Sequence, residues 1–192
     1  FDNEAGIWFK GNYSGNNERA KSAIIHKNTG DYGVGDLYFC LDGTGDNSNA
    51  TVSDVKMKIN SSGQVTKPSQ ASFAAYHNQN AYSLHDQVFP FNTTKHNVGN
   101  HFNTSNYRFT APVDGRYLFN FHSIYNSNGQ QDVQIRVNNS SSRGMMFHVA
   151  QTGGNWDLGS CSYLLDLNAN DYVTMWSVSN TGWHGNNWGM FS

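Results

Sequence analysis

The sequence predicts an all-β protein whose antiparallel strands pack as a sandwich. Charged residues make up only 14% of the 192 residues, and aromatic residues make up another 14%. Asn, Ser, Thr and Gly supply most of the polarity, as in strand-rich proteins with hydrogen-bonding loops. Several segments alternate apolar and polar side chains with a period of two, which indicates strands. Only residues 17–27 have a composition compatible with even a short helix.

The N-terminal part of the chain, residues 1–70, contains short strand-like segments separated by Gly, Asn and Asp turns. Each segment is too short to bury a core by itself, so we expect this part to need partner chains. The predicted strands lie at 6–9, 23–25, 37–41 and 55–59.

A domain boundary is predicted near Lys67–Gln70. Pro68 ends one element there, because proline removes a backbone donor and fixes φ. Residues 71–76 then have the composition of a new strand. The sequence therefore divides into a β-rich domain at 1–70 and a second domain at 71–192.

The second domain is rich in aromatic residues between positions 91 and 121. Residues 115–121 alternate strictly, so Tyr117, Phe119 and Phe121 share one face of a strand. The segment 107–110 alternates before them, and 111–115 has the Pro and Gly of a turn. We therefore expect a hairpin that buries its aromatic side chains against a second sheet.

The spacing of these residues resembles the signature of the complement C1q globular head, a jelly roll shared with the tumour necrosis factor family. The resemblance extends over 71–192 and implies further strands at 131–138 and 144–150 and a closing strand at 187–191. It also implies a strand, a tight turn and a second strand at 163–167 and 170–173, and Asn170 suits this turn because asparagine readily adopts the left-handed conformation. It implies a jelly-roll sandwich whose signature aromatics belong to the core. The signature residues are Phe91, Asn97, Phe102, Phe109, Gly115, Tyr117, Phe119 and Phe121.

A second resemblance concerns Asn60–Val65, an Asn-rich turn followed by Gly-x-Val. It is similar to the endings of shaft segments in phage tail fibres and tailspikes, which wind three chains together. C1q-like heads also trimerise. Both resemblances imply a homotrimer with an intertwined N-terminal domain.

Several function classes are disfavoured by composition. The formal net charge is −2 without a basic patch, so no nucleic-acid partner is expected. No apolar run approaches ~20 residues, so no membrane insertion is expected. The eight His residues form no His-x-His or His-Glu-x-x-His motif, and Gly-x-Ser-x-Gly is absent. We therefore expect no enzyme activity and no cofactor, and we expect Cys40 and Cys161 to be free thiols.

One segment, Asp42–Asn49, superficially resembles an oxygen-rich calcium loop. It lacks the terminal Glu of an EF-hand, and a plain hairpin loop is the favoured interpretation. Calcium therefore stays a minor alternative, and no metal site is assigned.

Surface recognition remains as the predicted activity. Two tryptophans are flanked by turn residues, so we expect both to reach loops, where an exposed ring beside amides can bind a sugar. Trp176 and Trp188 are instead expected in the core or an interface. The candidate ligand-binding residues are Trp183, His184, Asn186, Trp156 and Asn155.

These features predict a receptor-binding protein of a phage tail fibre, located on the virion. Its trimeric head would attach to a host surface polysaccharide or receptor, and its shaft would contact other fibre or tail proteins. Two alternatives are a secreted C1q-like lectin or adhesin and a head that only trimerises. A depolymerase is a weaker one. Because the chain opens at Phe1, we expect it to be part of a longer or processed product.

Overall fold

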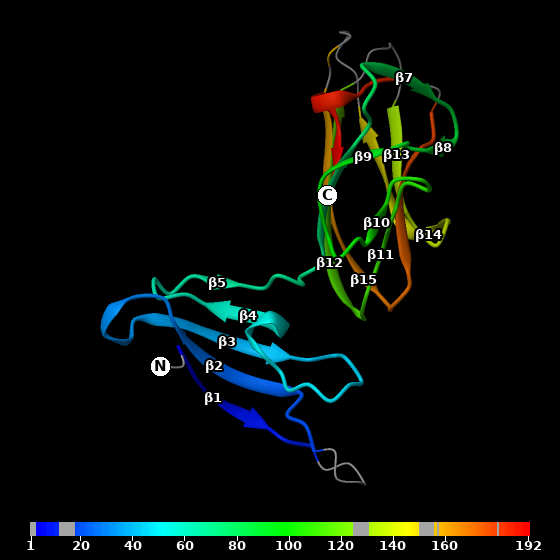
Figure 1. Cartoon of the computed structure of the whole chain (residues 1–192). Coiled ribbons are helices and arrows are strands. Elements are labelled where there is room, and N and C mark those ends of the chain that lie inside the picture. The colour runs from blue at the N-terminus through cyan, green and yellow to red at the C-terminus, as the bar shows by residue number, and fades with distance from the viewer. Residues whose placement is uncertain (1–2, 12–17, 125–130, 150–155, 157, 180) are drawn as a thin grey trace. The chain divides into compact units, whose positions relative to one another are not determined.

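The computed structural model of the chain describes residues 3–11, 18–124, 131–149, 156, 158–179 and 181–192. The chain divides into two compact units, Phe1–Gln70 and Ala71–Ser192, here called the N-terminal unit and the head (Figure 1). Both units are built of strands, and the only described helices are three short 3₁₀ turns.

The N-terminal unit is a five-stranded antiparallel sheet in which each strand pairs with the next along the chain. The expected isolated strands therefore form one sheet within a single chain. Residues 22–28 form a strand, which confirms the strand predicted at 23–25 and leaves no helix within 18–27; Ile24 and Ile25 pair with the following strand. The elements are β1 (Glu4–Phe9), β2 (Ser22–Asn28), η1 (Asp31–Gly33), β3 (Gly35–Leu41), η2 (Val52–Asp54), β4 (Val55–Ile59) and β5 (Val65–Thr66).

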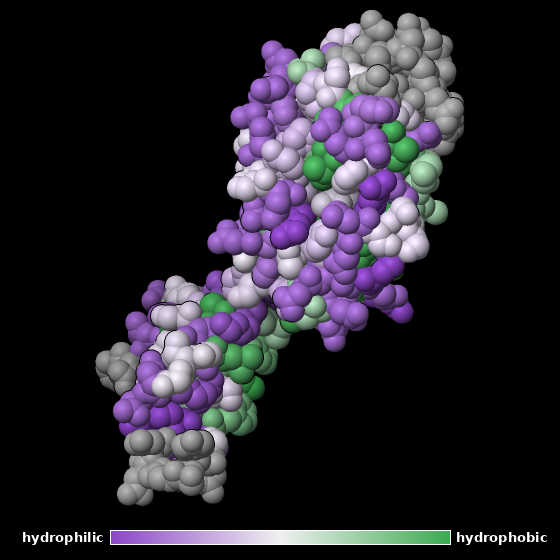
Figure 2. Space-filling view, turned by 90° about the vertical axis from the view of Figure 1, so that its right-hand side faces the viewer, coloured by the Kyte–Doolittle hydropathy of each residue, from purple (hydrophilic) through white to green (hydrophobic). Residues whose placement is uncertain are grey.

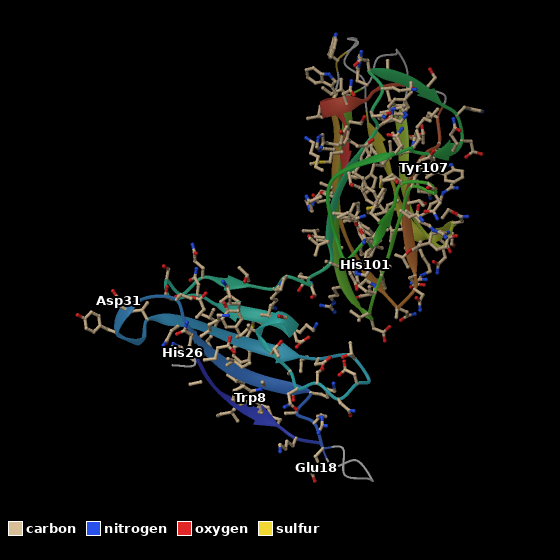
Figure 3. The ribbon with its side chains drawn as sticks, viewed as in Figure 1. Trp8, Glu18, His26, Asp31, His101 and Tyr107 are labelled. Atoms are coloured by element: carbon tan, nitrogen blue, oxygen red, sulfur yellow. The ribbon has the colours of Figure 1, made fainter. Side chains whose placement is uncertain are left out.

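The two faces of this sheet differ in how much they are covered. One face packs against the segment that contains Ala50 and buries a small core of Ala23, Ile25, Cys40 and Ala50. Trp8, labelled in Figure 3, donates from Nε1 to the Ala50 carbonyl at 3.0 Å on this side.

The opposite face is apolar and open to solvent. The register aligns Ile7, Ile24, Phe39 and Met57 across four strands. Ile7 is 63% exposed, and a groove of about 420 Å³ runs beside Ile24 and Phe39. Figure 2 shows apolar side chains gathered on one side of this unit.

The head consists of two antiparallel sheets and a small two-stranded sheet. The first sheet has the order β10-β11-β16-β13-β14, with β8 also paired to β16; the second has the order β15-β12-β18-β6-β9; β17 pairs with β7. The elements are β6 (Ser72–Tyr76), β7 (Ala81–Leu84), β8 (Gln87–Val88), β9 (Thr93–Val98), β10 (Phe102–Asn103), β11 (Arg108–Thr110), β12 (Gly115–Ile124), β13 (Gln131–Val137), β14 (Ser140–Val149), β15 (Leu158–Leu167), β16 (Tyr172–Ser177), β17 (Thr181–His184), η3 (Asn186–Trp188) and β18 (Met190–Phe191).

Phenylalanine rings from both large sheets fill the core of the head. Phe73 stacks on Phe102 and Phe109, with ring centroids 4.8 and 5.2 Å apart. Phe119 and Phe121 are buried, whereas Leu118, next to Phe119, is 60% exposed, which confirms the predicted alternation of this strand. The interpretation of the signature aromatics as core residues is also confirmed.

The predicted hairpin of 107–110 with 115–121 is wrong. β11 pairs with β10 and β16, whereas β12 pairs with β15 and β18, so the two strands lie in different sheets. The segment 111–114 crosses from one sheet to the other instead of reversing within one. Such crossings between sheets are a property of sandwiches that local alternation does not encode.

Candidate functional site

An exposed aromatic cluster lies at one end of the head and consists of Trp156, His184 and Trp188. The rings of Trp156 and His184 stack with centroids 4.3 Å apart and an interplanar angle of 9°. Trp188 meets Trp156 edge to face at 5.5 Å. Because Trp156 is 60% exposed and Trp188 is 49% exposed, the cluster presents a broad apolar surface to solvent.

The short sheet of β7 and β17 positions His184. Trp183 and His184 are consecutive in β17, so their side chains point to opposite faces. Trp183 is fully buried against Phe89 and Phe121, with centroid distances of 4.6 and 6.3 Å. The buried indole therefore anchors the strand and leaves the imidazole of His184 on the outer side.

Trp188 follows a tight turn that depends on Gly185. A Cβ at Gly185 would collide with the backbone carbonyls of Gln79 and His77, so the close approach of the two segments requires glycine. The amide of Gly185 donates to the Asn80 carbonyl at 3.0 Å, and the amide of Trp188 donates to the Gly185 carbonyl at 3.1 Å. These bonds fix the 3₁₀ turn η3 that carries Trp188.

Amide groups border the aromatic cluster. Asn186 has φ of 53°, and its backbone amide donates to the His77 carbonyl at 2.5 Å. Its side-chain nitrogen donates to Oδ1 of Asn80. Flat aromatic rings bordered by fixed amides suit the binding of a sugar. The rings can stack on the apolar C–H face of the sugar, and the amides can form hydrogen bonds with its hydroxyl groups.

Beneath the cluster, His77 is a buried support and not a contact residue. Its ring stacks on Tyr82 with centroids 4.2 Å apart, and Nδ1 accepts from the Gln79 amide at 3.1 Å. Burial lowers the pKa of His77, which favours the neutral ring. Burial also raises the pKa of Tyr82, so this phenol stays protonated.

The predicted site residues are partly brought together. Trp156, His184 and Asn186 lie at the same end of the head around the aromatic cluster. The expectation that Trp183 reaches an exposed loop is wrong, because it belongs to β17 and is 0% exposed. Asn155 lies outside the described residues.

Sequence reasoning missed Trp188. It was expected in the core or an interface as part of a closing strand at 187–191, but the described strand β18 is confined to Met190–Phe191. The residues next to Trp188 in the sequence, Asn-Asn before it and Gly189 after it, are typical of turns and could have indicated an exposed position.

The oxygen-rich loop of the N-terminal unit surrounds a lysine. Nζ of Lys21 lies 2.7 Å from both Asp42 Oδ2 and Asp46 Oδ1. Ser48 also bonds to both carboxylates, because its hydroxyl donates to Asp42 Oδ2 at 2.9 Å and its backbone amide donates to Asp46 Oδ1 at 2.9 Å. These contacts hold the pKa of each carboxyl far below its usual range, with the Lys21 bond as the largest cause. Lys21 thus occupies the place where a loop of this type would hold a cation.

Three further observations concern metal binding, membrane-spanning helices and cysteines in the described residues. They include no group of three or more His, Cys, Asp or Glu side chains arranged to hold a metal ion. No helix in the described ranges is long and apolar enough to cross a membrane. Cys40 and Cys161 are free thiols, as predicted.

Comparison with known proteins extends this description. The sequence profile of the C1q domain matches residues 71–191. A comparison with curated protein sequences gives no match.

Among solved structures, the globular domain of the zebrafish complement 1qA protein is similar, with a TM-score of 0.50 and 17% identity over 64% of this chain and 94% of that chain. The tumour necrosis factor Eiger from S. frugiperda gives a TM-score of 0.48 and 12% identity over 64% and 90%. The carbohydrate-binding module Xyl-CBM35, in complex with a glucuronic acid-containing disaccharide, gives 0.37 and 14% over 62% and 91%. At these identities the first likeness concerns the fold alone.

Proposed function

We propose that this chain, which belongs to the C1q domain family, is the receptor-binding protein of a phage tail fibre. Its trimeric head would attach to a glycan on the host cell. The stacked and exposed pair Trp156–His184 is the observation that carries the binding role. The role is adhesion and not catalysis, since recognition by aromatic faces and amides needs no acid–base groups.

Sugar binding at the aromatic cluster is supported by its rigidity as well as its chemistry. Trp183 anchors β17 in the core, and the turn at Gly185 is fixed by backbone hydrogen bonds. A ring platform that is already ordered loses little conformational entropy when a ligand binds. Trp156 and Trp188 therefore suit weak stacking contacts with the apolar face of a sugar ring.

A trimer would convert such weak contacts into firm attachment. Three identical sites on one particle raise the effective concentration for each further contact, so avidity exceeds the affinity of one site. The head offers an apolar surface for assembly on the outer face of its second sheet. Leu118 and Leu164 face each other across β12 and β15, and they are 60% and 55% exposed.

The N-terminal unit also favours assembly with copies of itself. Its open sheet face exposes Ile7 and Phe9 beside a groove of about 420 Å³, which is unusual for a surface that stays in water. A shaft or neck in which three such faces cover one another would bury these side chains. The proposed shaft role rests on this face and on the Asn60–Val65 turn that resembles tail-fibre shafts.

Binding to an array of purified bacterial surface polysaccharides tests the adhesive role. The full chain is compared with Trp156→Ala and Trp188→Ala, and Tyr32→Ala is the matched control because Tyr32 is a fully exposed aromatic of the N-terminal unit. We expect the two head variants to lose about tenfold or more in avidity, since each substitution removes an aromatic contact from every copy of the site. Unchanged binding in both head variants would refute the site.

The tail-fibre assignment has its own test. Purified protein should compete with phage particles for adsorption to the host, and the coding sequence upstream of Phe1 should encode a tail-attachment module. A signal peptide or collagen repeats upstream would instead support the secreted lectin or adhesin.

The exposed Leu118–Leu164 surface also favours a second candidate, a head that serves only to trimerise. Leu118→Glu with Leu164→Glu should dissociate the assembly in light scattering under either function. Particles that carry Trp156→Ala and Trp188→Ala together separate the two candidates. Normal adsorption of those particles would favour the trimerisation head.

A further inference from the structure

A row of outward-facing side chains follows β16 on the first sheet of the head. Val173 and Met175 of this strand point into the core and are 0% and 1% exposed. By alternation, Tyr172, Thr174 and Trp176 point to the outer face. Tyr107, which directly precedes β11 beside this row, is labelled in Figure 3.

Both aromatic rings of the row carry an arginine. Cζ of Arg108 lies 4.5 Å from the ring centroid of Tyr172, and Cζ of Arg136 lies 4.0 Å from that of Trp176. The arginines come from β11 and β13, which flank β16 on its two sides. The row therefore has a flat guanidinium–aromatic stack at each end.

Hydrogen bonds hold the stack of Arg136 and Trp176 in place. Nε of Arg136 donates to Oε1 of Gln134 at 2.7 Å, and Nε1 of Trp176 donates to Oδ1 of Asp86 at 2.8 Å. Gln134 is only 5% exposed, so its acceptor is fixed. Within the described part of the chain, the Nη atoms of Arg136 have no hydrogen-bond partner, and their donors are available to a ligand.

The other stack is held in a similar way. Nε and Nη2 of Arg108 lie 3.0 and 3.2 Å from the side-chain oxygen of Asn106 in the amide orientation that satisfies both residues. A guanidinium that is already oriented loses little rotamer freedom when it forms further bonds, and its planar fork suits carboxylate and sulfate oxygens.

Thr174 lies between the two stacks and has a buried hydroxyl group. It is the register partner of Arg136 across the ladder and is only 4% exposed, although it points away from the core. Among the described residues its Oγ1 has no hydrogen-bond partner. A buried hydroxyl without a partner is costly in a native fold, so its removal without a change of shape should not destabilise the head.

We infer that this row, defined by Arg108, Tyr172, Thr174, Trp176 and Arg136, binds an acidic polysaccharide whose chain lies along β16. Tyr172 and Trp176 are four residues apart, so the stacks are about 13 Å apart at ~3.3 Å per residue. That distance fits an extended polymer with repeated carboxylate or sulfate groups and is too long for one small anion. Arg108 and Arg136 would each bind an anionic group, and the Tyr172 and Trp176 rings would hold the two guanidinium groups in place.

Local charge is compatible with an anionic ligand. Among the described residues, Asp86 is the one carboxylate bonded to the row, and it neutralises only part of the charge of the two arginines. Asp171, next to Tyr172, is already paired with Nη2 of Arg143 at 2.7 Å. The row is distinct from the aromatic cluster of Trp156, His184 and Trp188, so the inference stands apart from the proposed glycan contact at the end of the head.

Binding of the full chain to immobilised polygalacturonate and dextran sulfate, with neutral dextran as reference, tests this inference at ~0.15 M ionic strength. The variants are Arg108→Gln with Arg136→Gln, and Thr174→Val. The charge-matched control is Lys10→Gln with Lys67→Gln, two exposed lysines of the N-terminal unit. We expect the double arginine variant to bind at least about tenfold more weakly, as for lost charge-assisted hydrogen bonds.

Thr174→Val provides a control within the row because it removes the buried hydroxyl, keeps the shape and leaves both arginines in place. We expect its binding to match that of the native chain while the thermal midpoint stays equal or rises, since a buried donor without a partner is removed. Equal losses in the lysine control would show nonspecific attraction and overturn the inference. Unchanged binding in the arginine variant, or tighter binding of duplex DNA than of either polysaccharide, would also overturn it.

Discussion

The two units of the chain bury very different cores. The head encloses eight phenylalanines and Trp183 between its sheets, whereas the described core of the N-terminal unit consists of Ala23, Ile25, Cys40 and Ala50. The head thus buries a large core within one chain, although Leu118 and Leu164 stay exposed on its second sheet. The N-terminal unit covers one face of its sheet and leaves Ile7 and Phe9 on the other face exposed. One protein thus combines a head with a closed core and an N-terminal sheet with one uncovered apolar face.

The largest expected effect is in the core of the head. Phe73→Ala should lower the free energy of unfolding of the head by about 3–5 kcal/mol, because the ring stacks on Phe102 and Phe109 and meets Phe191 edge to face. Near-ultraviolet circular dichroism in urea measures the loss. Val113→Ala, at a position 61% exposed, is the control and should change the value by less than ~0.5 kcal/mol. A loss below ~1 kcal/mol for Phe73→Ala would show that the core tolerates the cavity.

The second-largest effect is expected in the small core of the N-terminal unit. Ile25→Ala should cost about 2–4 kcal/mol, and it removes the largest apolar side chain of a four-residue core. We expect residues 1–70 to unfold while the head stays folded. Hydrogen exchange should show lost protection in β1 to β5 and unchanged protection in the strands of the head, with Val34→Ala as the exposed control. Unfolding of both units in one step would contradict their independence.

A smaller effect concerns acid stability of the head. Asp171 accepts from Arg143 Nη2 at 2.7 Å, Asn138 Nδ2 at 2.6 Å and the Asn168 amide at 3.0 Å, which hold its pKa well below the usual range. Its ionised form stabilises the fold above the unfolded pKa of ~4, and this contribution is lost as the pH falls through the folded pKa.

Asp171→Asn should therefore lower the thermal midpoint by a few degrees at pH 7, and the difference from the native chain should shrink below about pH 4. Asp166→Asn is the control, because its side chain is 80% exposed beside Arg116 and such pairs contribute little. A difference that stays constant down to pH 2 would rule out the linkage to Asp171.

The smallest effect is expected at the aromatic cluster. Trp156→Ala should change the free energy of unfolding by no more than ~0.5 kcal/mol, because the indole is mostly exposed. The same substitution at the buried Trp183 should cost about 3–5 kcal/mol. Chemical denaturation of the two variants side by side measures this difference. Equal losses would mean that Trp156 supports the fold and is no free contact surface.

Much of the fold follows from local patterns in the sequence. The alternation in 115–121 indicated which face of β12 is buried, and Phe119 and Phe121 are in the core as expected. Asn170, which was expected to tolerate a left-handed turn, has φ of 71°. The spacing of the aromatic residues led to the C1q resemblance, which the profile match at 71–191 confirms.

What failed concerns contacts between distant parts of the chain. The alternation of 107–110 and 115–121 could not reveal that β11 and β12 belong to different sheets, because partner choice depends on the whole sandwich. Trp183 was misplaced for a similar reason. Its flanking Gly and Asn residues indicate a loop, yet pairing with β7 turns 181–184 into a strand and directs the indole inward.

The candidate site was recovered in part. Trp156, His184 and Asn186 were selected because turn residues surround them, and they lie at one end of the head. Trp188 was assigned to a strand by the family resemblance, although its own neighbours indicate a turn. The stack of Trp156 on His184 joins residues 28 positions apart, and no local pattern contains that contact.

The close approach at Gly185 has a consequence for natural variation. Any larger residue there would push against the carbonyl oxygen of Gln79 and displace the neighbouring turn. Positions 156 and 188, by contrast, project into open solvent and tolerate replacement without disturbing their support. If the aromatic cluster binds a host glycan as proposed, natural variants should diversify these two positions and retain glycine at 185.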